Sequence, residues 1–197
     1  MDDIIKQYTI KPVIWHERNL KILWHSRTVA AAAESIANQI ETLDPQKAYL
    51  YGMMHDFGKF YLSMAEKYKH PSLGYELMIE NYPDIAEICI THPFPEVTLT
   101  EYLVHYCNGD ELEVEKILDY KTGIEHNDYI KLIQFCDKIC GINEYLTLDY
   151  KFKWYFKRYP IERDLLEQRY HIYMELKGYF DKLSKMDTYD LFKFDKL

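Results

Sequence analysis

The sequence predicts an all-α fold, a single compact helical bundle of about six to eight helices. Apolar residues recur at spacings of three and four along most of the chain, whereas no segment shows the alternation typical of a strand. The 197 residues include only seven glycines and seven prolines, which disfavours an all-β protein with many tight turns. The composition, 48% hydrophobic and 28% charged, is that of a globular protein, and the length suffices for one domain with a substantial core.

The first two predicted helices lie near the N-terminus. The first spans about residues 20–40, where the apolar face repeats at three and four residues: Ile22, Val29, Ala32, Ala33, Ile36, Ala37 and Ile40. The second begins after Asp44, a natural N-cap, because Pro45 fits the first position of a helix. Gly58 marks the expected end of this second helix.

Three further helices are expected in the middle of the chain. Pro71 begins a short helix. Asp84 is expected to cap the next one, which Pro93 ends. Another helix is predicted over residues 98–107.

Three more predicted helices complete the bundle. The helix over residues 110–120 opens with Asp110 and Glu113 at capping-box spacing. A strongly amphipathic helix covers residues 128–145, and a long helix covers residues 161–185.

The C-terminal region is assigned to an extension of the main domain. We place the main helical domain in residues 1–150 and a helical extension that packs on it in residues 151–197. The extension opens with Lys151–Tyr159, "KFKWYFKRY", which interleaves bases with aromatic residues. We interpret it as an amphipathic packing segment with solvated lysines. Packing against a partner in a homodimer is the alternative role for the extension.

The overall charge argues against nucleic acid as a partner. The net charge is −8, from 24 basic and 32 acidic residues, so the chain repels polyanions on average. No window approaches 18 consecutive apolar residues, and the N-terminus lacks the basic start and apolar run of a signal peptide. The four cysteines form no CxxC pair, and Cys136 and Cys140 suit a helical core. A reduced cytoplasmic protein without membrane association is therefore expected.

Several polar residues interrupt otherwise apolar helix faces. His25 lies on the apolar stripe of the first helix, His92 closes the apolar face of its own helix, and Asp137 lies among Ile133, Cys136 and Cys140. His55 and Asp56 are adjacent in "GMMHDFGKF". Each could be a hydrogen-bonded core residue, but one metal centre would explain all of them together.

The types of side chain limit which ion could bind. A buried carboxylate requires a nearby cation, whether a metal or a basic side chain. Imidazole and carboxylate ligands suit first-row divalent ions such as Fe, Mn, Co, Ni or Zn, and a soft thiolate site is not indicated.

In this order, the residues resemble the HD superfamily of metal-dependent phosphohydrolases. The matching elements are His25 in "WHSRTVAAAAESIA", the doublet His55 and Asp56 in "GMMHDFGK", and Asp137 in "YIKLIQFCDKI". The segments "HPSLGYELM" and "ICITHPF" resemble the additional histidine positions of members that hold two metals, here His70 and His92. The resemblance spans about residues 20–145.

The resemblance implies specific roles for these residues. His25, His55, Asp56 and Asp137 would form the minimal metal site. His70 and His92 would complete a second metal position, with Asp56 as the bridging ligand, so that one or two divalent ions (Fe, Mn, Co, Ni, Zn or Mg) are expected. Lys59 resembles the family lysine that meets a substrate phosphate, although a solvated lysine just after a helix end is the alternative.

The implied activity is hydrolysis of a phosphate ester or anhydride by metal-bound hydroxide. The expected substrate is a small phosphorylated compound, with a nucleotide favoured. The "GYP" signature of the cyclic-di-GMP phosphodiesterase branch is missing, because "HPSLGYEL" has no proline after its Gly-Tyr. The chain is also short for the deoxynucleotide triphosphohydrolases. The ligand order is similar to that of bacterial dinucleoside tetraphosphatases, but the long His92–Asp137 interval resembles a small group of HD proteins more closely.

Alternatives remain open at two levels. His105 could replace His92 as a ligand, whereas His16 precedes the periodic helix and His171 is expected to be structural. A catalytically silent HD-fold domain that binds a ligand or regulates a partner is the alternative function. A purely structural helical protein, whose polar residues pair with one another, is a third interpretation.

Overall fold

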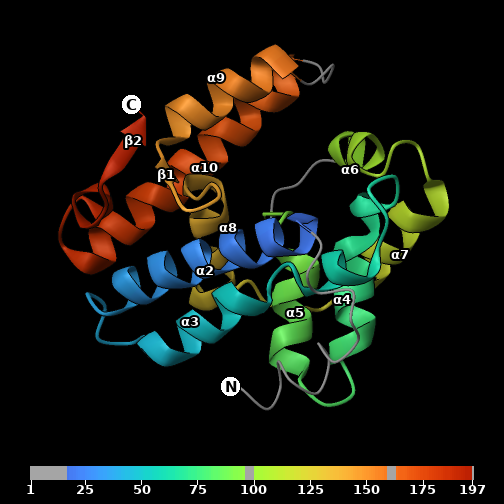
Figure 1. The fold of residues 1–197 in the computed structure, drawn as a ribbon, viewed down its shortest axis with the longest axis horizontal. Helices are drawn as coiled ribbons and strands as arrows, with labels where there is room; N and C mark the ends of the chain where they lie inside the picture. Colours follow the sequence, from blue (N-terminus) through green and yellow to red (C-terminus); the bar gives the residue numbers. More distant parts are fainter. Residues whose placement is uncertain (1–16, 96–99, 159–162, 197) are drawn as a thin grey trace.

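The computed structural model describes residues 17–95, 100–158 and 163–196. Nine α-helices in these ranges confirm the all-α prediction (Figure 1). They are α2 (Glu17–Ala37), α3 (Pro45–Met54), α4 (His70–Met78), α5 (Pro83–Thr91), α6 (Thr100–Tyr106), α7 (Glu111–Lys121), α8 (Asp128–Ile139), α9 (Leu148–Arg158) and α10 (Arg163–Ser184).

Short elements connect these helices. Three 3-10 helices occur in the described ranges: η2 (Phe57–Tyr61), η3 (Lys67–Lys69) and η4 (Thr188–Leu191). Two short strands, β1 (Tyr145–Leu146) and β2 (Phe194–Lys196), form a parallel pair beside the C-terminal helices (Figure 1). The pair is too short to show the alternation by which a strand is recognised in a sequence.

Local capping explains where several helices begin. The Asp44 carboxylate accepts hydrogen bonds from the backbone N–H groups of Gln46 and Lys47, as expected for an N-cap followed by proline. Asp110 accepts from the N–H of Glu113 at the start of α7. The Glu113 side chain does not complete a capping box, because its carboxylate accepts a hydrogen bond from the Ser72 hydroxyl instead.

Two predicted boundary residues have different roles from those expected. Tyr82, not Asp84, is the N-cap of α5, and the Asp84 carboxylate pairs with Lys47 Nζ at 3.1 Å. Gly58 does not end α3, which stops at Met54 and is followed by η2. These errors arise because a proline or glycine indicates a break in helical structure but does not fix its register.

The C-terminal half departs from the prediction in length and number. Helix α8 ends at Ile139, six residues before the predicted end, because Cys140 is extended and pairs with Tyr145 in an antiparallel bridge. Most of "KFKWYFKRY" lies in α9, a ninth helix beyond the six to eight expected. Phe152 is buried, whereas Trp154 and Phe156 are exposed, as in an amphipathic helix.

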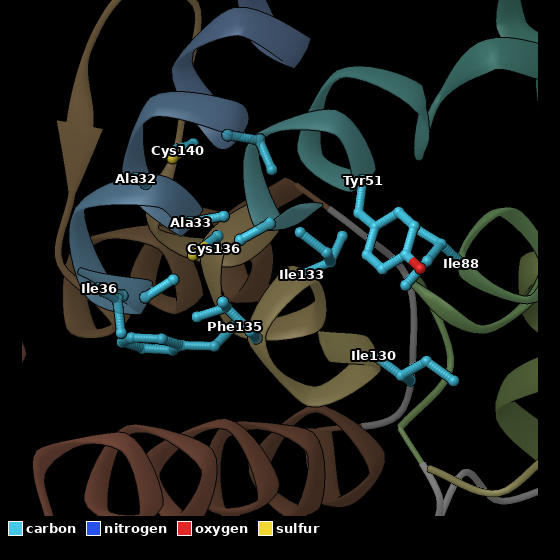
Figure 2. Close-up of a cluster of buried hydrophobic side chains, with 14 of the residues drawn as sticks. Ala32, Ala33, Ile36, Tyr51, Ile88, Ile130, Ile133, Phe135, Cys136 and Cys140 are labelled. Atoms are coloured by element: carbon cyan, nitrogen blue, oxygen red, sulfur yellow. The ribbon is translucent and has the colours of Figure 1, made fainter. Parts of the chain in front are cut away.

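Helix α8 lies at the centre of the core. Figure 2 shows α8 side chains packed against α2, α3 and α5: Ile130, Ile133, Phe135 and Cys136 meet Ala32, Ala33, Ile36, Tyr51 and Ile88. The same cluster includes Phe152 of α9 together with Tyr173 and Phe180 of α10. The four cysteines are buried and free. None of the helices in the described ranges has the length and apolar character needed to cross a membrane.

Helices α2 and α3 approach closely at Gly52. A Cβ at position 52 would lie 2.5 Å from the Ala30 Cα atom and 2.7 Å from the Ala30 nitrogen. Only glycine permits this contact without a shift of the backbone. The contact fixes the end of α3, and therefore the doublet that follows, relative to α2.

We predict that Gly52→Ala destabilises the protein by about 1–3 kcal/mol, because the added methyl group would push α2 from α3. Gly178→Ala is the matched control, since Gly178 is exposed in α10 and a Cβ there would meet nothing within 4 Å. The control should be neutral or stabilising by about 0.5–1 kcal/mol. Urea denaturation measures both values, and equal effects of the two variants would contradict the close-contact explanation.

Candidate metal centre

The ends of three helices meet at one buried site. His55 is the C-cap of α3, His92 is the C-cap of α5, and His70 is the first residue of α4. Asp56 immediately follows His55. Helix α2 contributes His25 from its side, so four separate helices place an imidazole at the site.

Asp56 lies at the centre of the histidines. Its Oδ2 atom is 3.4 Å from His55 Nε2 and 3.8 Å from His25 Nε2. Its Oδ1 atom is 3.2 Å from His70 Nε2 and 3.3 Å from His92 Nε2. Each oxygen atom of the Asp56 carboxylate therefore faces one pair of histidines. Oδ2 faces His25 and His55, and Oδ1 faces His70 and His92.

Asp137, on α8, lies beside His25 and His55. Its Oδ1 atom is 3.0 Å from His25 Nε2 and 3.7 Å from His55 Nε2. The structure therefore brings all six predicted ligands together: His25, His55, Asp56, His70, His92 and Asp137.

Backbone carbonyls fix the tautomer of all four histidines. Each Nδ1 atom lies within hydrogen-bond distance of a carbonyl oxygen: His25 of Gly141 at 3.2 Å, His55 of Gly52 at 2.7 Å, His70 of Lys67 at 2.7 Å and His92 of Cys89 at 2.8 Å. A carbonyl oxygen only accepts, so each Nδ1 carries the proton and donates. In the neutral ring, each Nε2 then presents a lone pair to the centre.

These lone pairs face other electron-pair donors. His70 Nε2 and His92 Nε2 are only 3.1 Å apart. His55 Nε2 and Asp56 Oδ1 are buried without a hydrogen-bond partner in residues 17–95, 100–158 and 163–196. Buried polar atoms are normally paired, so this arrangement favours a cation at the unpaired atoms. The donor set therefore fits a divalent metal ion.

Two groups of side chains have the spacing needed to hold an ion. His25, His55 and Asp56 form one, and Asp56, His70 and His92 form the other, with ligand atoms within 4.8 Å of one another in each group. The shared residue is Asp56. The arrangement can accommodate one ion or two.

Residues 22–140, more than half of the chain, match the HD domain. The protein belongs to the HD family. This places it in the superfamily of metal-dependent phosphohydrolases, and all six residues of the centre lie within the matched region. No curated protein and no solved structure matches the chain.

Burial and charge set the protonation of the HD centre. Burial lowers the pKa of His92 to about 3, and burial together with Lys59 lowers the pKa of His70. Both imidazoles are therefore neutral near pH 7 and available as ligands. Burial opposes ionisation of Asp56, but Lys59 and His55 outweigh it and hold the pKa of this carboxyl well below its usual value. Burial also opposes ionisation of Asp137, but Lys138 and His25 outweigh it and keep the pKa of Asp137 well below its usual value.

Two lysines accompany the HD carboxylates. Lys59 Nζ lies 2.6 Å from Asp56 Oδ2, and its side chain is 29% exposed. Lys138, which is buried, donates to Asp137 Oδ2. Lys59 thus lies between the centre and the outside, where its predicted contact with a phosphate is geometrically possible.

A pocket of about 670 Å³ opens beside the HD centre. His25, His70, His92 and Asp137 form its inner wall. Five basic side chains also line it: Lys59, Lys67, Lys138, Lys151 and Arg169. This concentration of positive charge occurs in a chain whose net charge is −8. The pocket is therefore suited to an anion.

Four of these five basic residues were not among the predicted site residues: Lys67, Lys138, Lys151 and Arg169. Lys138 is adjacent to Asp137, a signal that the sequence offered. Lys151 and Arg169 belong to α9 and α10, beyond the HD match, and no local pattern distinguishes them from the other bases of these helices.

Two other histidines of the described ranges, His105 and His171, belong to neither group of candidate ligands. His105 is exposed on α6 and lines the pocket, but it belongs to neither ligand group among the described residues. His171 is exposed on α10. His16 lies outside the described residues.

We predict that Asp56→Asn removes metal from both halves of the HD centre, because Asp56 is common to both ligand groups. His92→Gln should affect only the half that contains His70, so the variant should retain the ion beside His25 and His55. Metal content measured by inductively coupled plasma mass spectrometry tests both. His105→Gln is the matched control, and a metal loss in this variant equal to that of His92→Gln would contradict the assignment.

We also predict that acidification removes metal from the two halves at different pH values. Burial lowers the pKa of His55, but the negative charges of Asp56 and Asp137 outweigh burial, so its pKa is raised. A proton therefore competes for His55 at higher pH than for His70 or His92, whose pKa values are lowered. Metal content after dialysis from pH 8 to pH 5 should fall first beside His55. Earlier loss of metal beside His70 and His92 would contradict this order. Because His92→Gln should bind metal only beside His25 and His55, its dialysis curve shows which step of the unaltered protein belongs to that half.

Proposed function

We propose that this chain is a phosphohydrolase that cleaves a phosphate ester or anhydride of a small substrate, with a nucleotide favoured. The observation that carries the proposal is the set of four Nε2 lone pairs directed at Asp56, beside a pocket lined by basic side chains. A metal-binding centre next to an anion-binding pocket is the combination that phosphoryl transfer to water requires.

A divalent metal bound by these ligands would lower the pKa of a water molecule and polarise a phosphoryl oxygen. The chain's own residues supply the positioning. The backbone carbonyls orient His25, His55, His70 and His92. The two oxygen atoms of Asp56 lie beside both histidine pairs and so link the two halves of the centre. Such fixed orientation reduces the reorganisation needed when charge develops on the phosphoryl group.

Lys59 is proposed to bind the substrate phosphate. Its ammonium group lies 2.6 Å from Asp56 Oδ2 and its side chain lines the pocket. A phosphoryl oxygen near the centre would therefore come within reach of the same ammonium group. Charge-assisted hydrogen bonds of this kind are stronger than neutral ones.

The aromatic lining supports a nucleotide as the substrate. Tyr68, Tyr102, Tyr106 and Tyr155 line the pocket together with the basic side chains. An aromatic ring offers a face on which a nucleobase can stack, while the bases attract the phosphate.

We predict that the protein loaded with Mn or Fe hydrolyses at least one compound in a panel of nucleotides and phosphoesters. Asp56→Asn should lower kcat/KM by about 10³-fold or more, since it removes the shared ligand of the centre. Lys59→Met should raise KM by about 10- to 100-fold, the effect of losing one charge-assisted hydrogen bond. Lys21→Met, which alters an exposed lysine paired with Glu17 on α2, is the control.

Two outcomes would count against hydrolysis. Turnover that persists in Asp56→Asn would indicate a contaminating enzyme. Tight binding of a nucleotide by the metal-loaded protein without any turnover would favour the catalytically silent alternative.

A further inference from the structure

Arg169 is a buried cation without an acidic partner in the described part of the chain. Arg169 is 6% exposed, and no carboxylate of the described ranges forms an ion pair with it. The Nη2 atom donates to the Pro93 carbonyl at 3.1 Å and to the Tyr173 hydroxyl at 3.2 Å. The Nη1 atom is buried and has no hydrogen-bond partner among the residues that the structure describes.

The surroundings of Arg169 compensate its charge only in part. The guanidinium carbon lies 3.6 Å from the centre of the Tyr102 ring, a cation–π contact. This contact and the two hydrogen bonds supply no negative charge. A buried cation with an unpaired donor is costly, which indicates that an anion normally binds there.

Arg169 lies next to the HD centre. Its partner Pro93 directly follows His92, and both Arg169 and Lys138 lie 5.5 Å from the centre of the Tyr173 ring. Arg169 lines the same pocket as His92 and Asp137. An anion at Arg169 would thus be close to a phosphoryl group at the metal ligands without occupying the same position.

Lys151 adds a second positive charge to the lining of the same pocket. Its Nζ atom donates to the Cys140 carbonyl at 3.2 Å, and it forms no ion pair within the described ranges. Lys59 and Lys138, in contrast, are each paired with a carboxylate of the centre. Lys151 and Arg169, unlike these two lysines, line the pocket without an ion pair to a carboxylate of the described ranges.

We infer that Arg169 and Lys151 bind a second phosphate group of the substrate, beside the phosphoryl group that is cleaved at the HD centre. The inference rests on the proposed function, and it narrows the substrate class to compounds with two phosphate groups, such as nucleoside diphosphates or bisphosphates. A phosphate is favoured over a carboxylate because two unpaired cations match a dianion. Both residues come from α9 and α10, so the C-terminal extension would select the substrate.

The test uses the full-length chain and inorganic phosphate, with acetate as the comparison. Isothermal titration calorimetry is carried out on the metal-loaded protein and again after chelation, which removes phosphate binding by the metal. We expect the chelated chain to bind phosphate more tightly than acetate. Arg169→Gln should weaken phosphate binding by about 10- to 100-fold, and Lys151→Gln should weaken it by a smaller factor.

A matched control separates the pocket from general charge effects. Arg163→Gln removes another guanidinium from α10, one that is 80% exposed and paired with Glu167 at 2.8 Å. It should bind phosphate like the unaltered chain. Circular dichroism and the melting temperature verify that each variant is folded. If Arg169→Gln is not folded, phosphate binding by Lys151→Gln decides the test.

The outcomes distinguish this inference from the proposed function. Phosphate binding in Arg169→Gln and Lys151→Gln equal to that of Arg163→Gln would overturn the second phosphate site, even if the protein is an active hydrolase. Equal affinity for acetate and phosphate would overturn the phosphate assignment. Loss of phosphate binding in Arg169→Gln would support the site even if no compound in the substrate panel is hydrolysed.

Discussion

The mutual repulsion of electron-pair donors around Asp56 is the constraint on which the rest of the structure depends. Four imidazoles, each with its Nδ1 committed to a carbonyl, turn their lone pairs toward carboxylate oxygens that are themselves acceptors. Such a cluster does not hold itself together, so packing elsewhere must hold it. The buried faces of α2, α3, α5 and α8 supply this packing, and the close contact at Gly52 fixes the helix end that carries His55. The hydrophobic core thus stabilises a site that would be unfavourable on its own.

Much of the fold could be predicted from the helical spacing of apolar residues. The residues of the candidate site could be predicted from polar side chains that interrupt this spacing. His25 and Asp137 interrupt apolar faces, and a polar residue at such a position has few alternatives to pointing inward. The boundaries were less predictable. Asp84 looked like a cap, yet its carboxylate pairs with Lys47 of α3, a contact 37 positions away in the sequence that no local pattern encodes. Arg169 was missed for the same reason, because its contacts are with Pro93 and Tyr102, which are distant in the sequence.

The C-terminal helices extend the HD domain without leaving its core. Phe152 and Tyr173 belong to the same buried cluster as the α8 residues, although α9 and α10 lie beyond the matched region. These helices also line the pocket with Lys151 and Arg169. The family region therefore provides all the candidate metal ligands, whereas the part of the chain outside it supplies a large share of the basic lining. Such a division allows substrate preference to change while the metal centre is kept.

The pairing of Lys59 with Asp56 and of Lys138 with Asp137 also bears on how the protein matures. Small zinc domains fold only when the ion arrives, because metal binding supplies the folding free energy that their small cores lack. Here two ammonium groups of the chain already balance the two carboxylates, and a large apolar core surrounds them. Folding of the polypeptide would therefore not depend on a bound metal ion. A metal ion would then enter a site whose ligands are already in place.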